Sequence, residues 1–254
     1  MTGLLSTTDL AVGFGKKRSI EHIDLQLNAG ELVALIGVNG SGKSTLLHTL
    51  SGLLPPLAGT VHLQDDPIDA LRADQRARQM ALVLTGRPQV GLLDVRTLVG
   101  LGRQPWTGHF GRLSSEDRER IEEAMRATDT LRFADRHIGQ LSDGEAQRVM
   151  IARALAQDTP IILLDEPMAF LDLVNRILVF RSLRDLAHAR GKTILLSTHD
   201  LQTALDLCDR FFVVRDRTLW TGTAAEARSG NILKEAFRID GVEFDPNTGA
   251  FRSR

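Results

Sequence analysis

The strongest constraint on the fold is the segment at positions 37–45, which reads Gly-Val-Asn-Gly-Ser-Gly-Lys-Ser-Thr. Glycines lack a Cβ atom, so successive backbone N–H groups can converge on phosphate oxygens, and a following helix adds the positive end of its dipole. The run from Glu31 to Ile36 predicts a buried parallel strand before the segment, and Leu46 to Leu50 continues as a helix that starts near Lys43. This order of strand, loop and helix predicts a site for a nucleoside triphosphate.

The residue types of this loop predict how a triphosphate would be held. We expect Lys43 to reach the β- and γ-phosphates and the Ser44 hydroxyl to bind Mg²⁺. A hydrogen bond to a charged phosphate contributes about 1.5–3 kcal/mol, so several of them give ample affinity without any contact to the base. The other loop residues expected to contact the nucleotide are Gly37, Asn39, Gly40, Ser41, Gly42 and Thr45.

Two adjacent carboxylates follow another predicted strand. The apolar run Ile161 to Leu164 leads directly into Asp165 and Glu166, so both are expected at the carboxyl edge of a parallel sheet, where ligands bind in such folds. We expect Asp165 to hold Mg²⁺ through water and Glu166 to polarise the water that attacks the γ-phosphate. The alternative is a pair of solvated loop carboxylates. Their place after a phosphate loop and a strand favours an ATPase.

A second predicted anion site lies at Leu-Ser-Asp-Gly-Glu, positions 141–145, immediately before a helix from Ala146 to Leu155. Ser142 and the N–H groups of the helix start would bind an anion there. One chain, however, already holds its phosphates with the loop at 37–45. The simplest resolution is a head-to-tail homodimer in which each subunit closes the nucleotide site of the other.

The rest of the pattern predicts an α/β fold with one helical interruption. Alternation at Ile23, Leu25 and Leu27 predicts an antiparallel strand before the phosphate-loop strand. Apolar runs predict further strands at 60–63, 80–84, 193–196 and 211–214. Helices are predicted between about 95 and 157, one of them capped by residues 115–117 and running to Thr128. A later helix is expected to bury a stripe formed by Leu173, Ile177, Phe180, Leu183 and Ala187.

These elements predict an α/β fold: a doubly wound core with a mostly parallel sheet, flanking helices and an antiparallel amino-terminal β part, and with an inserted α-helical subdomain. We expect one domain over 1–254. Within it, residues 1–90 and 158–225 would form the nucleotide-binding core and 91–157 the helical subdomain. Residues 226–254 would add a helix and a hairpin.

Composition limits the classes of partner. The net charge of −1 argues against binding to nucleic acid or anionic lipid by bulk electrostatics. Cys208 is the only cysteine, so neither an intrachain disulfide nor a cysteine metal cluster can form. The start of the chain lacks the pattern of a signal peptide, and no apolar run reaches the roughly 20 residues needed to span a bilayer. Any membrane role is therefore expected to depend on a partner.

In order and spacing, the motifs resemble those of the ATP-binding subunit of ABC transporters. The set comprises 37–45, 141–145, Asp165-Glu166, Leu171-Asp172 and Ser197-Thr198-His199-Asp200, and the resemblance covers about residues 5–225. The resemblance implies that the core is a P-loop NTPase core, RecA-like.

For several side chains the resemblance implies a role. Phe14 would stack on adenine, His199 would sense the γ-phosphate, and Asp172 would act across the dimer. An ordinary core phenylalanine is the alternative for Phe14. The signature residues implied to contact the partner's nucleotide are Ser142, Gly144 and Glu145.

One segment indicates a branch of that family. Leu98 to Thr107 resembles a segment of ATPases that serve importers of iron-siderophore, haem and cobalamin. The alternative is an ordinary helix end terminated by Pro105, which would carry no information on the solute. The importer resemblance implies transmembrane permease subunits, a substrate-binding protein reached through the permease, and a location at the cytoplasmic face of the inner membrane.

A different class of function is a soluble ABC-type ATPase that acts on nucleic acid or ribosomes. Such proteins usually carry tandem ATPase domains, coiled-coil insertions or basic extensions, which this sequence lacks, so we expect no nucleic-acid partner.

The chain also departs from the family pattern. Thr85 stands where the family has a glutamine that ligates Mg²⁺, and Gln89 follows shortly after, so the replacement stays open between them. Asp143 and Glu145 place carboxylates in the signature where glycine and glutamine are usual, and Met168 replaces a threonine.

Overall fold

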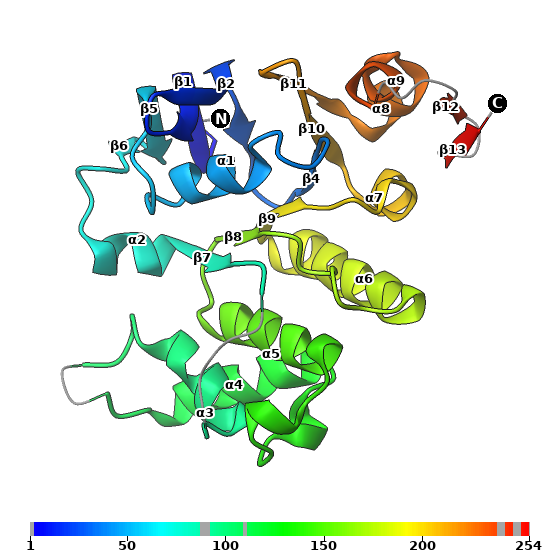
Figure 1. The fold of residues 1–254 in the computed structure, drawn as a ribbon. Coiled ribbons are helices and arrows are strands. Elements are labelled where there is room, and N and C mark those ends of the chain that lie inside the picture. The colour runs from blue at the N-terminus through cyan, green and yellow to red at the C-terminus, as the bar shows by residue number, and fades with distance from the viewer. Residues whose placement is uncertain (1–2, 87–91, 109–110, 238–241, 246–249, 254) are drawn as a thin grey trace.

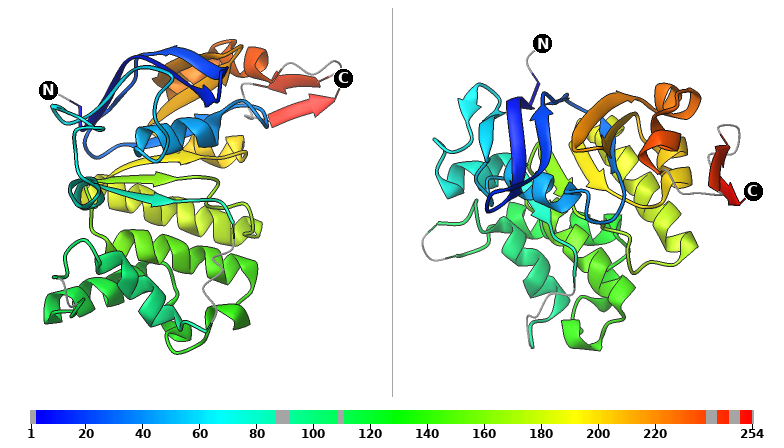
Figure 2. Two further views of the ribbon diagram at one scale, coloured as in Figure 1. Left: turned by 60° about the vertical axis from the view of Figure 1, so that its left-hand side comes forward. Right: turned by 45° about the horizontal axis from the view of Figure 1, so that its top comes forward.

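The structure is a computed structural model that describes residues 3–86, 92–108, 111–237, 242–245 and 250–253 of the 254-residue chain. The strands and the helices beside them form the upper part of the molecule in Figure 1, and the helices between residues 95 and 156 form a separate group below them. Figure 2 shows the same layers from two other sides. Within the described residues, no helix is both long and apolar enough to cross a membrane.

Strands near the amino terminus form an antiparallel sheet. They are β1 (Leu5–Phe14), β2 (Lys17–Ile23), β3 (Gln26–Leu27), β5 (Ala58–Leu63) and β6 (Asp66–Pro67). The hydrogen-bonded order is β2-β1-β5-β6, and β3 pairs with β1. The strand predicted from the alternation at 23–27 is divided, because Ile23 ends β2 and Leu27 lies in β3.

The second sheet carries the strand that leads into the phosphate loop. Its strands are β4 (Leu32–Ile36), β7 (Met80–Val83), β8 (Ile161–Leu164), β9 (Thr193–Ser197), β10 (Arg210–Arg215) and β11 (Thr218–Thr223). The order is β11-β10-β4-β9-β8-β7. All neighbours are parallel except β11, which is antiparallel to β10 and was not predicted. The predicted α/β class with a mostly parallel sheet is confirmed.

Both faces of the parallel sheet are buried, which explains its continuous apolar strands. In β4, Val33 and Leu35 face the antiparallel sheet and the helix α1 (Lys43–Leu50). Leu32 and Ala34 point to the opposite face, which is covered by α6 (Leu173–Arg190) and α7 (Leu201–Leu207). Smaller elements complete this part of the chain: α2 (Ala73–Gln79), α8 (Ala224–Ser229), α9 (Ile232–Ala236), β12 (Val242–Asp245) and β13 (Ala250–Ser253). The last two form the predicted carboxyl-terminal hairpin.

The stripe predicted along α6 is correct in its later part and wrong at its start. Phe180, Leu183 and Ala187 are buried, whereas Leu173 is 65% exposed and Ile177 is half-buried. Leu173 is the first residue of the helix. The apolar contact near this end is made instead by Met168 and Leu171 of the preceding loop.

The inserted helices are α3 (Val95–Gly100), α4 (Ser115–Ala127) and α5 (Asp143–Ala156), with short 3₁₀ turns at 101–103, 131–133 and 138–140. They enclose an apolar cluster of their own. The N-cap of α4 is Ser114, whose hydroxyl accepts a hydrogen bond from the Asp117 N–H, so the helix begins one residue earlier than predicted. The boundaries of the subdomain at 91 and 157 remain a prediction.

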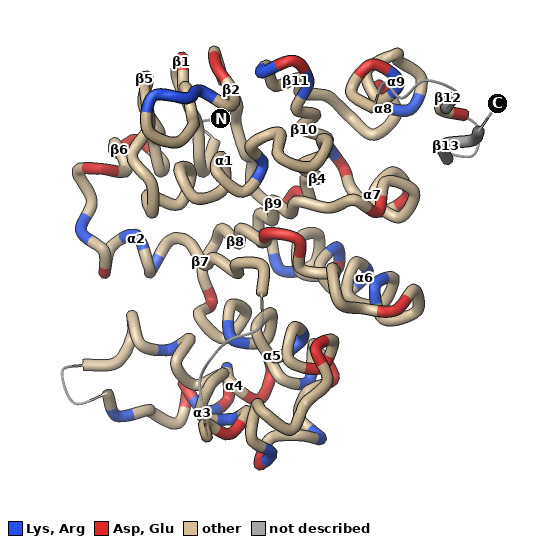
Figure 3. Tube along the Cα trace, in the orientation of Figure 1, with Lys and Arg blue, Asp and Glu red and all other residues tan. Residues whose placement is uncertain are grey.

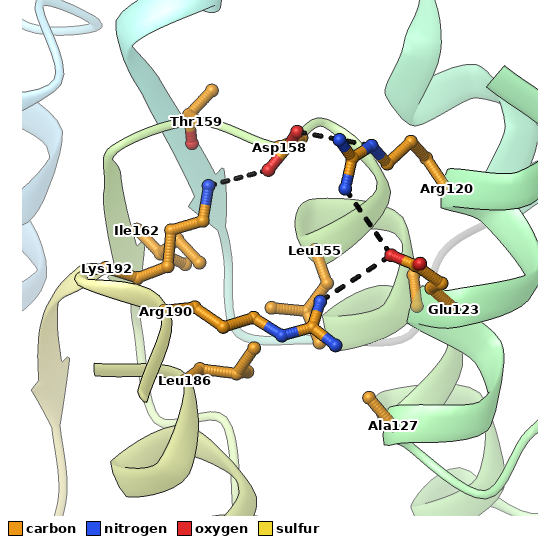
Figure 4. A pocket seen from close by; sticks show the side chains of 11 residues that line it. Arg120, Glu123, Ala127, Leu155, Asp158, Thr159, Ile162, Leu186, Arg190 and Lys192 are labelled. Atoms are coloured by element: carbon orange, nitrogen blue, oxygen red, sulfur yellow. Dashed lines mark hydrogen bonds and ion pairs between the residues drawn. The ribbon is translucent and has the colours of Figure 1, made fainter. Parts of the chain in front are cut away.

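Charged side chains connect these helices to the core (Figure 4). Arg120 of α4 lies 3.6 Å from the Asp158 carboxylate, which also pairs with Lys192 at 2.6 Å. Glu123, one turn further along α4, lies 3.6 Å from Arg190 at the end of α6. Helix α4, Asp158 and the segment 190–192 are therefore joined by ion pairs.

The segment Leu98–Thr107 forms another part of this junction. Arg103 is buried and donates hydrogen bonds to the Asp117 carboxylate at 2.8 Å and to the Ala156 carbonyl at 2.9 Å. The Trp106 indole donates to the Gln157 carbonyl at 2.7 Å, and the Arg78 guanidinium lies 5.6 Å from its ring centroid. Contacts among the inserted helices thus account for Arg103, and the contact with Arg78 of α2 accounts for Trp106.

Candidate functional site

The phosphate loop runs from the end of β4 to the start of α1. Gly40 and Gly42 have φ values of 76° and 103°, in the left-handed region that favours glycine. A Cβ at Gly42 would lie 2.8 Å from the Ser19 Cβ, and one at Gly37 would lie 2.8 Å from the Ser41 hydroxyl oxygen. The backbone path and the close packing both explain these glycines.

Lys43 is a buried polar side chain of the loop, and Ser41 has a buried hydroxyl oxygen. The Lys43 ammonium donates to the Gly37 carbonyl at 2.8 Å and to the Val38 carbonyl at 3.1 Å, and the residue is 5% exposed. Burial lowers the pKa of Lys43, and the nearby charges of Glu166 and Asp165 partly oppose that shift. The Ser41 hydroxyl oxygen is buried and lacks a hydrogen-bond partner among the described residues. An ammonium and an unpaired hydroxyl so placed suit phosphate oxygens.

The remaining loop residues differ in exposure. Asn39, Gly40 and Ser44 are exposed, and Thr45 is half-buried. Gly40 has open space where a Cβ would stand. The loop therefore presents both backbone and hydroxyl groups at its outer side.

The carboxylates meet His199 at the ends of the neighbouring strands. Asp165 directly follows β8, is 3% exposed, and accepts a hydrogen bond from the Ser197 hydroxyl at 2.8 Å. Glu166 is partly exposed, and its Oε1 lies 2.6 Å from the His199 Nε2. Together with Met168 and Thr198, Glu166 and His199 line a pocket of about 270 Å³. The structure therefore brings Lys43, Asp165, Glu166 and His199 to one edge of the sheet.

Phe14 lies on a second pocket beside the phosphate loop. This pocket of about 390 Å³ is lined by Phe14, Gly40 and Ser41 among others. Phe14 is 79% exposed, so the alternative of a core phenylalanine is wrong. An exposed aromatic ring beside a phosphate loop is suited to stacking on a base.

Several cations on the same pocket were not predicted. Lys17 and Arg18 are the first two residues of β2, Arg215 is the last residue of β10, and Arg217 lies in the β10–β11 turn. Figure 3 shows the basic colouring of the turn between β1 and β2. The run Lys16-Lys17-Arg18, which follows Phe14 after one glycine, was the available signal for this part. Arg215 and Arg217 gave no local signal, because they reach the phosphate loop only through the pairing of β10 with β4.

The signature residues lie elsewhere, at the start of α5. Ser142 is the N-cap: its hydroxyl oxygen accepts from the Glu145 N–H at 3.3 Å, while the Glu145 carboxylate accepts from the Ser142 N–H at 2.8 Å. The hydrogen bond that the Glu145 carboxylate accepts from the Ser142 N–H lowers the pKa of Glu145. A Cβ at Gly144 would lie 3.1 Å from the Phe170 carbonyl, so glycine lets the helix start approach that loop. Neither pocket described above includes Ser142, Gly144 or Glu145.

Asp172 is the N-cap of α6. Its carboxylate accepts hydrogen bonds from the Asn175 N–H at 2.8 Å and from the Asn175 side-chain amide at 2.7 Å, and these bonds lower its pKa. The side chain is exposed. The implied role across a dimer stays a prediction.

The departures from the family pattern have local explanations. The Thr85 hydroxyl donates to the Asp165 backbone carbonyl at 2.9 Å, which occupies it within the chain. Gln89 lies outside the described residues. Met168 is buried in the core below α6 and contributes to the pocket at Glu166, so an apolar side chain fits this position.

The oxygen atoms of the site suit a Mg²⁺ ion that is bound together with the nucleotide phosphates. Among the described residues, no group of three or more His, Cys, Asp or Glu side chains could hold a metal ion. Ser44 and Asp165 instead offer a hydroxyl and a carboxylate close to the phosphate loop. Mg²⁺ is usually bound by one or two such oxygens together with substrate phosphates, so these residues fit the ion.

A family model described as ABC transporter matches residues 20–169. The chain belongs to the ABC transporter family. It is an ABC ATPase, and the resemblance inferred from the motifs is confirmed.

Similar proteins support this assignment over nearly the whole length. The iron(3+)-hydroxamate import ATP-binding protein FhuC of Bacillus subtilis is 38% identical over 96% of this chain and 91% of the relative. The hemin import ATP-binding protein HmuV of Streptomyces coelicolor is 37% identical over 97% of this chain and 88% of the relative. A dimeric post-hydrolysis structure of the ATP-binding cassette MJ0796 bound to ADP and Pi matches with a TM-score of 0.77 and 28% identity, covering 87% of this chain and 98% of that one.

The geometry of Lys43 predicts a loss of nucleotide binding in Lys43→Ala. Its ammonium is the cation inside the loop, and a charge-assisted hydrogen bond contributes about 1.5–3 kcal/mol, so the dissociation constant for ATP should rise by about 10–100-fold or more. Isothermal titration calorimetry measures the change. Lys192→Ala is the control, because Lys192 is also mostly buried but pairs with the Asp158 carboxylate in the junction between the helices and the core. Unchanged ATP affinity in Lys43→Ala would refute the assignment.

His199→Ala is expected to lower turnover by about 10²-fold with little change in the KM for ATP, because a γ-phosphate contact matters most in the transition state. Steady-state ATPase kinetics test this. His188→Ala is a matched control, since His188 is similarly exposed and pairs with Asp209 at 3.0 Å, away from the pocket at Glu166. A rise in KM at unchanged kcat would make His199 a ground-state binding residue instead.

Proposed function

We propose that this ABC ATPase energises a membrane importer for an iron-chelate, haem or cobalamin-type solute. The observation that carries the ATPase part is the meeting of Lys43, Asp165, Glu166 and His199 at one edge of the parallel sheet. The relatives named for iron(3+)-hydroxamate and hemin import support the solute class.

In the proposed reaction, the phosphate loop binds the triphosphate and Phe14 stacks on the adenine. Lys43 neutralises charge on the β- and γ-phosphates, as its desolvated ammonium is suited to do. Glu166 accepts a proton from the attacking water, and His199 orients the Glu166 carboxylate through their 2.6 Å contact while contacting the γ-phosphate. Ser44 and Asp165 would hold Mg²⁺, which would neutralise charge on the phosphates.

A head-to-tail homodimer would complete the site. Ser142 and the start of α5 lie outside both pockets that adjoin the phosphate loop and Glu166. The positive end of the α5 dipole is suited to a phosphate, so the partner's Ser142, Gly144 and Glu145 would face the nucleotide. The dimeric form of the MJ0796 cassette supports this arrangement.

The proposed importer function implies partners for this subunit. Transmembrane permease subunits would hold this subunit at the cytoplasmic face of the inner membrane, and a substrate-binding protein would deliver the solute through the permease. The alternative, a soluble ABC-type ATPase on nucleic acid or ribosomes, has less support, because the net charge is −1 and the relatives reported above are named for import.

Glu166→Gln is expected to bind ATP but to hydrolyse it about 10²–10⁴-fold more slowly, because the amide cannot accept the proton from water. Bound ATP should then trap the dimer, which light scattering with ATP and Mg²⁺ detects as a doubled mass. The control is the double variant Lys43→Ala/Glu166→Gln, which should stay monomeric. A Glu166→Gln chain that loses turnover yet remains monomeric with bound ATP would refute the two-site dimer.

The solute class predicts a transport phenotype. Cells that lack this subunit should lose uptake of one of three labelled solutes, a ferric hydroxamate, haem or cobalamin, and the wild-type chain should restore it. Lys43→Ala should fail to restore uptake, whereas Lys192→Ala should restore it. Unchanged uptake of all three solutes in the deletion strain would refute the proposed solute class and leave the ATPase assignment intact.

A further inference from the structure

Ser197 is the last residue of β9 and joins the two carboxylate residues of the site. Its hydroxyl donates a hydrogen bond to the Asp165 Oδ1 at 2.8 Å and accepts one from the Glu166 N–H at 2.8 Å. The side chain is completely buried, with 0% exposure. Asp165 and Glu166 follow β8, so one hydroxyl links the carboxyl ends of two neighbouring strands.

The backbone conformation of Glu166 indicates what the contact with Ser197 does. Glu166 has a φ of 46°, in the left-handed region that residues other than glycine adopt only at an energetic cost. Such a conformation persists where the surroundings hold it, and the hydrogen bond from the Glu166 N–H to Ser197 is one such restraint. With the backbone so held, the Glu166 side chain reaches His199.

We propose that the Ser197 hydroxyl is a positioning group for ATP hydrolysis. It orients the Asp165 carboxylate toward the metal side of the site and holds the Glu166 backbone in the conformation that directs its carboxylate to His199. The inference rests on the proposed function, because it takes Asp165 as a Mg²⁺-binding residue and Glu166 as the general base. Ser197 itself does not contact the nucleotide in this proposal.

The same strand supplies a matched control. Thr193, the first residue of β9, is also completely buried. Its hydroxyl donates to the Asn28 carbonyl at 2.7 Å and accepts from the Gly30 N–H at 3.2 Å. Removal of either hydroxyl therefore breaks one donated and one accepted hydrogen bond in the same strand, but only Ser197 contacts the carboxylate residues.

The test compares Ser197→Ala, Ser197→Thr and Thr193→Val in the full-length chain. Four quantities are measured: kcat, the KM for ATP, the melting temperature, and the affinity for Mn²⁺ in the presence of ADP by electron paramagnetic resonance. The Mn²⁺ measurement reports on the Asp165 carboxylate without any turnover. Glu166→Gln is included to test the proposed function in the same series.

Ser197→Ala should lower kcat at least about tenfold and weaken Mn²⁺ binding about threefold or more, while the KM for ATP stays within twofold. Ser197→Thr keeps the hydroxyl and should recover most of both losses. Thr193→Val should lower the melting temperature about as much as Ser197→Ala does, with kcat and Mn²⁺ affinity near those of the wild type. If Ser197→Ala does not fold, Ser197→Cys takes its place, because the thiol is a weaker donor of similar size.

Two results would overturn the inference. If Ser197→Ala lowers only the melting temperature, as Thr193→Val does, the hydroxyl has a structural role alone. If Glu166→Gln keeps full turnover, the proposed role of Glu166 as the general base fails, and the inference fails with it. Loss of turnover in Glu166→Gln together with normal kcat in Ser197→Ala refutes the inference while the proposed function stands.

Discussion

The parallel pairing of β4, β9 and β8 is the constraint on which the rest of the structure depends. Its register places Leu35 opposite Ser197 and Leu196 opposite Leu164, so the three strands end at the same edge. The phosphate loop, the 197–200 segment and the Asp165-Glu166 pair leave the sheet there. Backbone hydrogen bonds between the strands therefore bring these three segments to one edge, and the strands that carry them are buried on both faces.

Local patterns in the sequence were sufficient for the fold class and for most elements. The strand, loop and helix around Lys43 depend on residues close in sequence, and so do the apolar runs that became β7, β8, β9 and β10. The family itself also followed from the order of motifs. The roles of individual site residues remain predictions, because the structure gives their positions and the comparisons give only the family.

The features that the sequence did not reveal depend on contacts between distant segments. The Ser197 hydroxyl meets Asp165 only because β8 and β9 pair, and Arg217 joins the pocket at Phe14 only through the β10–β11 turn. Helical periodicity predicts Leu173 in the core, although it is exposed, because periodicity describes the spacing of a stripe but not where the neighbouring sheet ends. Tertiary packing determines the surroundings of each of these residues, and a pattern within one segment of the sequence carries no information about such packing.

The capping box at the start of α5 has a consequence for the entropy of assembly. Reciprocal hydrogen bonds between Ser142 and Glu145 fix the first turn of this helix within a single chain, and Gly144 seats it against the Phe170 carbonyl. Ordering a backbone residue carries an entropic penalty of about 1–2 kcal/mol. For this turn, that penalty is met during folding of the monomer. Two subunits that close on a nucleotide would thus bring together surfaces that are already ordered, and more of their contact energy would remain available to hold the closed state.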